Sequence, residues 1–188
     1  KDCETEQEMS FAQDIVIREG DLILISGMSN YGKTALCLNF CGENVDKRPV
    51  LMGNEYTSLV DGKYVPSPRF LNRLDAMPWV QWMDEDKKDK VTLLPVWDDY
   101  AEHIVKDRIN IIDWINLPGE YYMISPVMEH IKKELGRGIA IIVLQKNEGA
   151  SSGRGGALTK DFTECELLLD NFGKFDVLLT IGKVKEST

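Results

Sequence analysis

Short apolar runs separated by polar turns recur along the chain. Five of them have the length and continuous apolar character of strands buried in a parallel sheet. They cover residues 22–26, 49–53, 91–95, 109–114 and 139–144. The run at 139–144 is the most apolar, so we expect it to form a central strand. A sixth run at 15–17 precedes the turn sequence Arg18-Glu19-Gly20-Asp21.

Helical patterns occupy several segments between these runs. Predicted helices cover residues 33–40, 69–76, 98–106 and 126–136, whereas the remainder of 57–90 has a weak, loop-like pattern. Residues 166–170 and 175–181 form a predicted C-terminal β-hairpin around Asn171-Phe172-Gly173. Strands that alternate with helices predict an α/β fold with a mostly parallel central sheet flanked by helices.

Length and composition narrow the class of protein. We expect one domain over residues 1–188, with 1–12 as a flexible, linker-like N-terminal segment. Hydrophobic residues make up 43 % and charged residues 28 %, an ordinary soluble composition. No apolar run approaches the roughly 20 residues of a membrane span, and the N-terminal residues show no signal-peptide pattern. We therefore expect a cytoplasmic protein without membrane association.

The cysteines are also consistent with a cytoplasmic protein. The chain holds Cys3, Cys37, Cys41 and Cys165, with no CxxC pair, so a structural zinc site is not expected. Cys37 and Cys41 lie one turn apart in a predicted helix. That spacing suits two buried small hydrophobic side chains in a reducing compartment.

The net charge of −9, from 31 acidic and 22 basic residues, excludes a domain-wide basic footprint for nucleic acid. Contact with DNA or RNA must therefore come from a local patch or from a surface shared within an oligomer.

The strongest chemical signal follows the first predicted strand. Its residues match G-x-x-x-x-G-K-[ST] in full, between an apolar strand and a helix, which is the context of a phosphate-binding loop. The glycines let the backbone wrap around phosphate oxygens, and the helix N-terminus supplies positive potential. We expect Lys33 to reach the β- and γ-phosphates of ATP and the Thr34 hydroxyl to bind Mg²⁺. The predicted nucleotide-binding residues are Gly27, Met28, Ser29, Asn30, Tyr31, Gly32, Lys33, Thr34 and Ala35.

Asp113 closes the strand predicted at 109–114. An acidic residue at the end of a buried strand beside a phosphate loop can hold the water shell of Mg²⁺. The alternative is a strand-end Asp that caps a turn. The phosphate loop favours the metal role.

Two further polar residues end predicted strands. Glu55 follows the strand at 49–53, where a carboxylate can act as general base toward the attacking water. Gln145 follows the strand at 139–144, where an amide can sense the γ-phosphate or orient water. A surface Glu at a loop entry and a plain strand-end Gln remain open as alternatives.

This series of motifs resembles the RecA-like core of the replicative helicase family typified by DnaB. The similarity rests on the phosphate loop, Glu55, Asp113 and Gln145 in that order, on the opening at residues 17–22, and on Ser152-Gly153-Arg154-Gly155-Gly156. The last element is similar to a Gly-Arg-Gly-Gly sequence in phage and mobile-element members. The resemblance covers the chain from about Phe11 to its end.

The resemblance implies an ATP-hydrolysing ring, commonly a hexamer, in a bacterial, phage-infected or mobile-element host cell. It implies ATP sites between subunits, completed by a basic residue of a neighbour. Lys183 and Lys185 occupy the place of the family's Lys-x-Arg, so this chain carries Lys where the family has Arg. Lys neutralises charge but lacks the bidentate fork. Two solvated lysines are the alternative.

The family's DNA contacts lie in loops that correspond here to residues 116–122 and 146–160. The first is poor in positive charge. The second, rich in Gly and Ser and predicted to be mobile, offers Lys146, Arg154 and Lys160, which could follow a single-stranded DNA backbone when six copies line a pore. A disordered surface loop is the alternative.

The sequence thus favours a RecA-like motor domain of a DNA helicase or replication ATPase. A RecA- or KaiC-like regulatory or recombination ATPase without unwinding activity is one alternative, which the acidic net charge favours. A small-molecule or nucleoside kinase is another, although Arg137 and Arg154 alone make a poor arginine-rich lid. A degenerate scaffold that binds nucleotide without turnover is a third.

Overall fold

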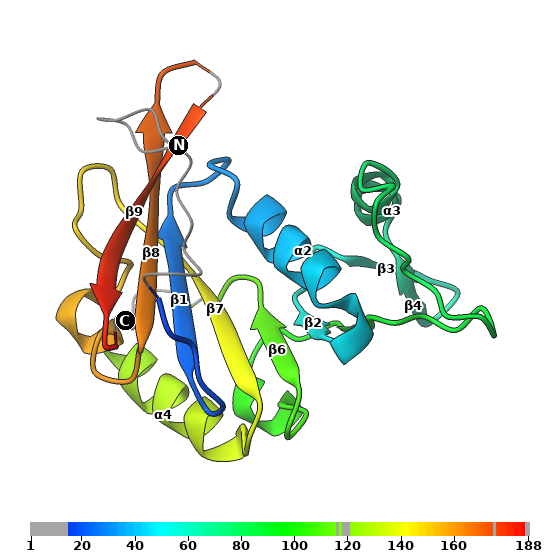
Figure 1. The fold of residues 1–188 in the computed structure, drawn as a ribbon, viewed down its shortest axis with the longest axis horizontal. Helices are drawn as coiled ribbons and strands as arrows, with labels where there is room; N and C mark the ends of the chain where they lie inside the picture. The colour runs from blue at the N-terminus through cyan, green and yellow to red at the C-terminus, as the bar shows by residue number, and fades with distance from the viewer. Residues whose placement is uncertain (1–14, 116, 118–120, 175, 187–188) are drawn as a thin grey trace.

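The computed structural model describes residues 15–115, 117, 121–174 and 176–186, and it shows an α/β protein built around a seven-stranded sheet (Figure 1). The strand order is β5-β2-β6-β7-β1-β8-β9. All neighbouring pairs are parallel except β8 and β9, which form the C-terminal hairpin. The strands are β1 (Leu22–Gly27), β2 (Val50–Met52), β5 (Thr92–Leu94), β6 (Ile109–Ile112), β7 (Ile139–Gln145), β8 (Cys165–Phe172) and β9 (Asp176–Val184).

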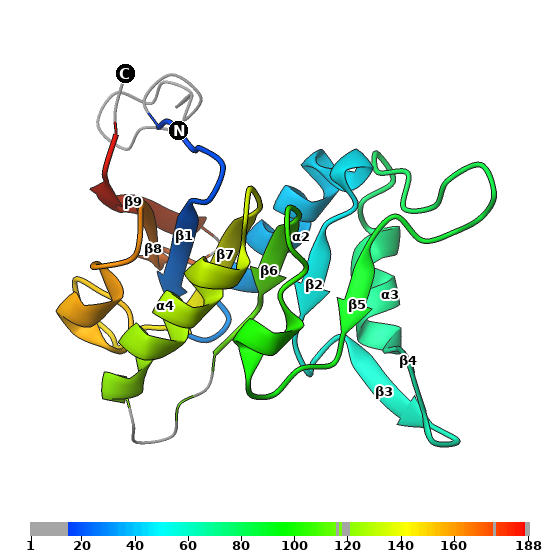
Figure 2. The ribbon, with the colours of Figure 1, turned by 90° about the horizontal axis from the view of Figure 1, so that it is seen from below.

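Helices cover both faces of the sheet (Figures 1 and 2). Ile23 and Ile25 of β1 pack in one core cluster with Cys41 of α2, whereas Leu24 packs in a second cluster with Met128 of α4. This alternation along β1 places α2 and α4 on opposite sides of the sheet. The helices are α2 (Lys33–Glu43), α3 (Pro68–Asp75) and α4 (Ile124–Glu134), and short 3₁₀ helices cover Val45–Lys47, Tyr100–His103, Tyr121–Met123 and Gly156–Thr159.

These elements confirm most of the predicted pattern. The five predicted strands form, and the 139–144 run lies in the middle of the sheet as β7. The helix predicted at 33–40 extends to Glu43, and Cys37 and Cys41 are fully buried as expected. Residues 15–17 form no strand. The predicted flexible segment 1–12 lies outside the described residues.

One predicted helix is wrong. Of residues 98–106, only the 3₁₀ helix Tyr100–His103 is helical. The side chain of Asn110 accepts a hydrogen bond from the Val105 amide and donates one to the Val105 carbonyl, both at 2.9 Å. The buried amide of Asn110 thus uses the backbone groups that would have continued the helix.

A second hairpin was not predicted from the sequence. β3 (Thr57–Val60) and β4 (Lys63–Pro66) pair antiparallel and project from the side of the molecule where α3 lies (Figures 1 and 2). Asp61 and Gly62 join them with φ values of 49° and 75°. Such an Asp-Gly pair with two positive φ angles is typical of a two-residue hairpin turn, so the signal was present in the sequence.

Candidate active site

The carboxyl ends of the parallel strands β1, β2, β6 and β7 meet at one edge of the sheet. In open α/β sheets this edge is where ligands bind. A cavity of about 700 Å³ opens there. It brings together six of the nine predicted nucleotide-binding residues with the three candidates from neighbouring strands, namely Ser29, Asn30, Gly32, Lys33, Thr34, Ala35, Glu55, Asp113 and Gln145. Gly27, Met28 and Tyr31 are not in its lining.

The backbone of the phosphate loop needs its glycines. A Cβ on Gly27 would lie 3.0 Å from the Leu169 Cβ and 3.1 Å from the Leu169 carbonyl oxygen of β8. Gly32 has a φ of 78° and caps the N-terminus of α2. The first hydrogen bond of that helix runs from the Leu36 amide to the Gly32 carbonyl at 2.9 Å. The amides of the helix's first residues therefore lie ahead of its hydrogen-bonded turns, where they can bind an anion.

Lys33 lies in the middle of this charged site. Its Nζ donates a hydrogen bond to the Met28 carbonyl within the loop, 2.5 Å away. Burial lowers the pKa of Lys33, and the nearby carboxylates of Asp113 and Glu55 partly offset that shift. Burial thus reduces the hydration of the ammonium group, while two nearby carboxylates favour its charged form.

Asp113 follows β6 and lines the cavity. Its amide donates to the Met52 carbonyl at 2.9 Å, and one carboxylate oxygen accepts a hydrogen bond from the Tyr56 hydroxyl. Burial, and then the Asp113 charge, raise the pKa of Tyr56 well above its usual value, so the phenol remains a neutral donor. Tyr56 was not among the predicted site residues.

The donor set suits magnesium. Thr34 offers a hydroxyl and Asp113 a carboxylate to the same cavity, and hard oxygen donors are what Mg²⁺ prefers. Among the described residues, no three His, Cys, Asp or Glu side chains gather into a metal site of their own. Mg²⁺ characteristically takes one or two protein ligands and completes its shell with phosphates and water.

Glu55 and Gln145 reach the cavity from β2 and β7. Glu55 is exposed, and its carbonyl accepts a hydrogen bond from the Ser67 hydroxyl at 3.2 Å. The Gln145 amide nitrogen lies 3.4 Å from the Ser29 hydroxyl of the phosphate loop. The sheet therefore brings both predicted side chains to the cavity beside the phosphate loop.

Two arginines of α3 were not predicted. Arg69 and Arg73 lie one turn apart and both line the cavity. Ser67 caps their helix by accepting the Phe70 amide at 3.2 Å. Among the described residues, neither guanidinium has a hydrogen-bond or ion-pair partner. The R-x-x-x-R spacing in the predicted helix 69–76 was the available signal.

The candidates for DNA contact do not form an exposed basic patch. Lys146 is buried and pairs with Asp170 of β8, so in this conformation its ammonium is withdrawn from solvent. Lys160 lies 3.5 Å from the fully buried Glu166. Arg154 lines a second, small cavity together with Gln145. Part of the loop is packed, since Gly153 and Thr159 are buried; of the other predicted DNA loop, residues 116 and 118–120 lie outside the described residues.

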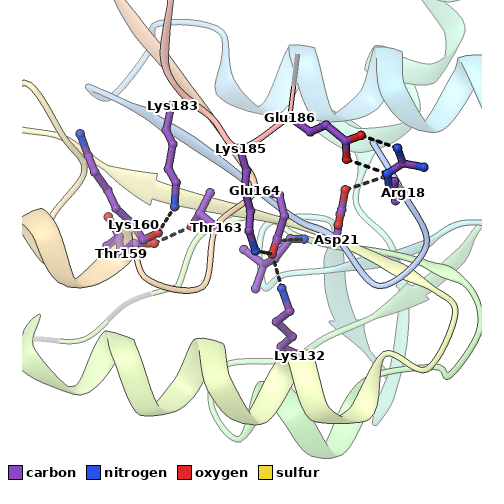
Figure 3. Close-up of polar contacts among 11 residues, drawn as sticks. Arg18, Asp21, Lys132, Thr159, Lys160, Thr163, Glu164, Lys183, Lys185 and Glu186 are labelled. Atoms are coloured by element: carbon purple, nitrogen blue, oxygen red, sulfur yellow. Dashed lines mark hydrogen bonds and ion pairs between the residues drawn. The ribbon is translucent and has the colours of Figure 1, made fainter. Parts of the chain in front are cut away.

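The candidates for action on a neighbouring subunit, Lys183 and Lys185, are engaged within their own chain (Figure 3). Lys183 donates to the Lys160 carbonyl, and Lys185 lies 3.4 Å from Glu164, which also pairs with Lys132. Because β9 runs antiparallel to β8, both lysines lie near the amino end of β1. They therefore lie at the amino ends of the parallel strands, whereas the phosphate loop of the same chain lies at the carboxyl ends.

Comparison with known proteins adds no family to this picture. No protein-family model matches the chain, and no curated protein matches it either. Within the part of the chain that the structure describes, no helix is long and apolar enough to cross a membrane.

Proposed function

We propose that this chain is a magnesium-dependent NTPase with a RecA-like core, which binds ATP at the phosphate loop and hydrolyses it. The observation that carries the proposal is one cavity lined by the N-terminus of α2, by the oxygen donors Thr34 and Asp113, and by the carboxylate of Glu55. A phosphate loop, a metal-binding pair and a carboxylate base are the parts that phosphoryl transfer to water requires.

Each residue of the site has a defined role in this scheme. The first amides of α2 and the Lys33 ammonium bind the β- and γ-phosphate oxygens. Thr34 and Asp113 would hold Mg²⁺, which would neutralise charge on the phosphates. Glu55 accepts a proton as the water oxygen bonds to the γ-phosphorus and the bond to the β–γ bridging oxygen breaks. Gln145 orients the water.

Arg69 and Arg73 extend the proposed site beyond the phosphate loop. Their helix approaches the cavity from the side of Glu55, and their two positive charges complement a triphosphate. We assign them to phosphate binding within the same chain. Lys183 and Lys185 are left as candidates for a neighbouring subunit's site, because they lie far from their own.

Within this class, we propose a motor domain of a DNA helicase or replication ATPase that acts on single-stranded DNA as a ring oligomer, on the strength of its resemblance to the DnaB-type core. One alternative has a specific observation in its favour. The burial of Lys146 and its pairing with Asp170 favour a RecA- or KaiC-like ATPase that does not unwind DNA.

Phosphate release from ATP, measured with and without single-stranded DNA, tests both levels of the proposal. We expect Glu55→Gln to lower turnover by at least about 100-fold and still bind Mg-ATP. Lys33→Ala should lose turnover and bind Mg-ATP at least about tenfold more weakly. Glu43→Gln, an exposed change at the end of α2, is the matched control and should retain activity. Normal turnover by Glu55→Gln would remove the proposed base. Hydrolysis that single-stranded DNA does not stimulate would favour the non-unwinding alternative, and phosphate transfer to an acceptor would favour a kinase.

A further inference from the structure

A buried tyrosine holds the carboxylate of Asp113 from inside the protein. Tyr56 is only 1 % exposed, and its hydroxyl donates a hydrogen bond to Oδ2 of Asp113. Asp113 itself is half-buried and lines the cavity. The carboxylate therefore has one oxygen engaged by the protein, and among the described residues no hydrogen bond or ion pair engages its other oxygen.

Close packing between the ends of β2 and β6 makes this contact possible. The Asp113 amide donates to the Met52 carbonyl at 2.9 Å. A Cβ on Gly53 would lie 3.0 Å from the Asp113 carbonyl oxygen and 3.0 Å from the ring of Tyr56. Both distances are shorter than most Cβ contacts, so a side chain at residue 53 would force the ring or the aspartate to shift by a few tenths of an ångström.

The tyrosine is in turn fixed by α3. Its ring meets Phe70 edge-on, with centroids 5.2 Å apart and planes at 67°. Its carbonyl accepts the Ser67 amide at 2.8 Å. Since both the ring and the main chain of Tyr56 are held, the position of its hydroxyl is determined by the fold.

We propose that Tyr56 is a positioning residue that orients the Asp113 carboxylate toward magnesium bound with the nucleotide. This inference rests on the proposed function. Partners that hydrogen-bond to a metal-binding side chain fix its orientation and tune its affinity for the metal. Mg²⁺ is demanding in this respect, because its octahedral geometry tolerates little displacement of a ligand. Tyr56 directly follows Glu55, so two adjacent residues would supply the base and the orientation of the metal-binding group.

Tyr56→Phe removes the hydroxyl and keeps the ring. The measurement is equilibrium binding of a fluorescent ATP analogue, first in EDTA and then across a Mg²⁺ titration. We expect the affinity of Tyr56→Phe for the nucleotide in EDTA to stay within about twofold of the wild type. The Mg²⁺ concentration that gives half of the Mg²⁺-dependent change in nucleotide affinity should rise by about tenfold or more. An unchanged Mg²⁺ dependence in a folded Tyr56→Phe protein would overturn the assignment.

Two control variants distinguish the loss of the Tyr56 hydroxyl from a general loss of stability. Tyr64→Phe removes a hydroxyl from the exposed β4 and should leave the Mg²⁺ dependence unchanged. Phe70→Leu disturbs the packing of the same ring without removing its hydroxyl; it should lower the melting temperature and change the Mg²⁺ dependence less than Tyr56→Phe. If Phe70→Leu shifts the Mg²⁺ dependence as much as Tyr56→Phe, Tyr56 acts through packing and the proposal fails.

A result that refutes the proposed function can be distinguished from one that refutes only the role of Tyr56. A wild-type protein that binds no nucleotide, with or without Mg²⁺, refutes the NTPase and leaves nothing for Tyr56 to position. Should Tyr56→Phe not fold, wild-type protein labelled with 3-fluorotyrosine replaces it. The Tyr56 fluorine resonance is assigned by elimination from Phe variants of the other five tyrosines. It should shift when Mg²⁺ is added to the nucleotide-bound protein, and a resonance that does not respond would overturn the proposal.

Discussion

Replacing Arg73 with Ala should weaken the binding of Mg-ATP by about 10- to 150-fold. Arg73 is half-buried on α3 and lines the same cavity as Lys33. Because its guanidinium has no partner among the described residues, it can bind a ligand phosphate without first breaking an ion pair. A hydrogen bond to a charged group contributes about 1.5–3 kcal/mol, which corresponds to that loss of affinity. Arg69 is exposed and therefore better screened, so Arg69→Ala should cost less than about tenfold.

Competition titration with a fluorescent nucleotide measures this effect. Arg73→Lys keeps the charge but not the planar fork, so its affinity should lie between those of the wild type and Arg73→Ala. Arg137→Ala is the matched control, since Arg137 is exposed and pairs with Glu19 away from the cavity. Wild-type affinity in Arg73→Ala would show that α3 does not reach the bound nucleotide, and the assignment of both arginines would be rejected.

Three further predictions concern stability and reactivity. Gly27→Ala should destabilise the fold by about 1–3 kcal/mol through overpacking against Leu169, as measured by urea denaturation; a loss below about 0.5 kcal/mol would contradict the close fit. The pKa of Glu164 is lowered on balance, since its hydrogen bonds and charge pairing outweigh burial, so its stabilising contribution is present above its unfolded pKa near 4.5 and is lost as the pH falls below it. Glu164→Gln should therefore lower the melting temperature more at pH 7 than at pH 3, and an equal loss at both would refute this. Burial raises the pKa of Cys37 and brings that of Cys41 to about 12, so a thiol reagent should modify both only after unfolding, and rapid labelling of the native protein would contradict their burial.

The local structure around the candidate site follows from local sequence. The glycines of the loop, the strand before it and the helix after it are specified by neighbouring residues, so the strand-loop-helix arrangement could be predicted without the fold. Asp113, Glu55 and Gln145 end parallel strands, and parallel strands bring their carboxyl ends to one edge. Their convergence on one cavity follows from that geometry.

What the sequence missed depends on contacts between distant segments. Tyr56 and Asp113 are 57 residues apart, and only the pairing of β2 with β6 brings them together. Lys146 was predicted as an exposed loop cation. Its partner Asp170 lies 24 residues further along the chain, in β8 of the C-terminal hairpin, so the pairing depends on the fold. Residues 98–106 have acceptable helix propensity, but the buried side-chain amide of Asn110 hydrogen-bonds to the backbone of Val105, and no α-helix forms.

The most direct test of the site is calorimetric titration of Mg-ATP into the wild-type protein and into Lys33→Ala, each at a concentration where its oligomeric state has been measured. We predict saturable binding of one nucleotide per chain in the wild type and a loss of affinity of at least about tenfold in Lys33→Ala. Absence of binding to the wild type with both Mg-ATP and Mg-GTP, in every assembled form, would contradict the assignment of this cavity to a nucleotide.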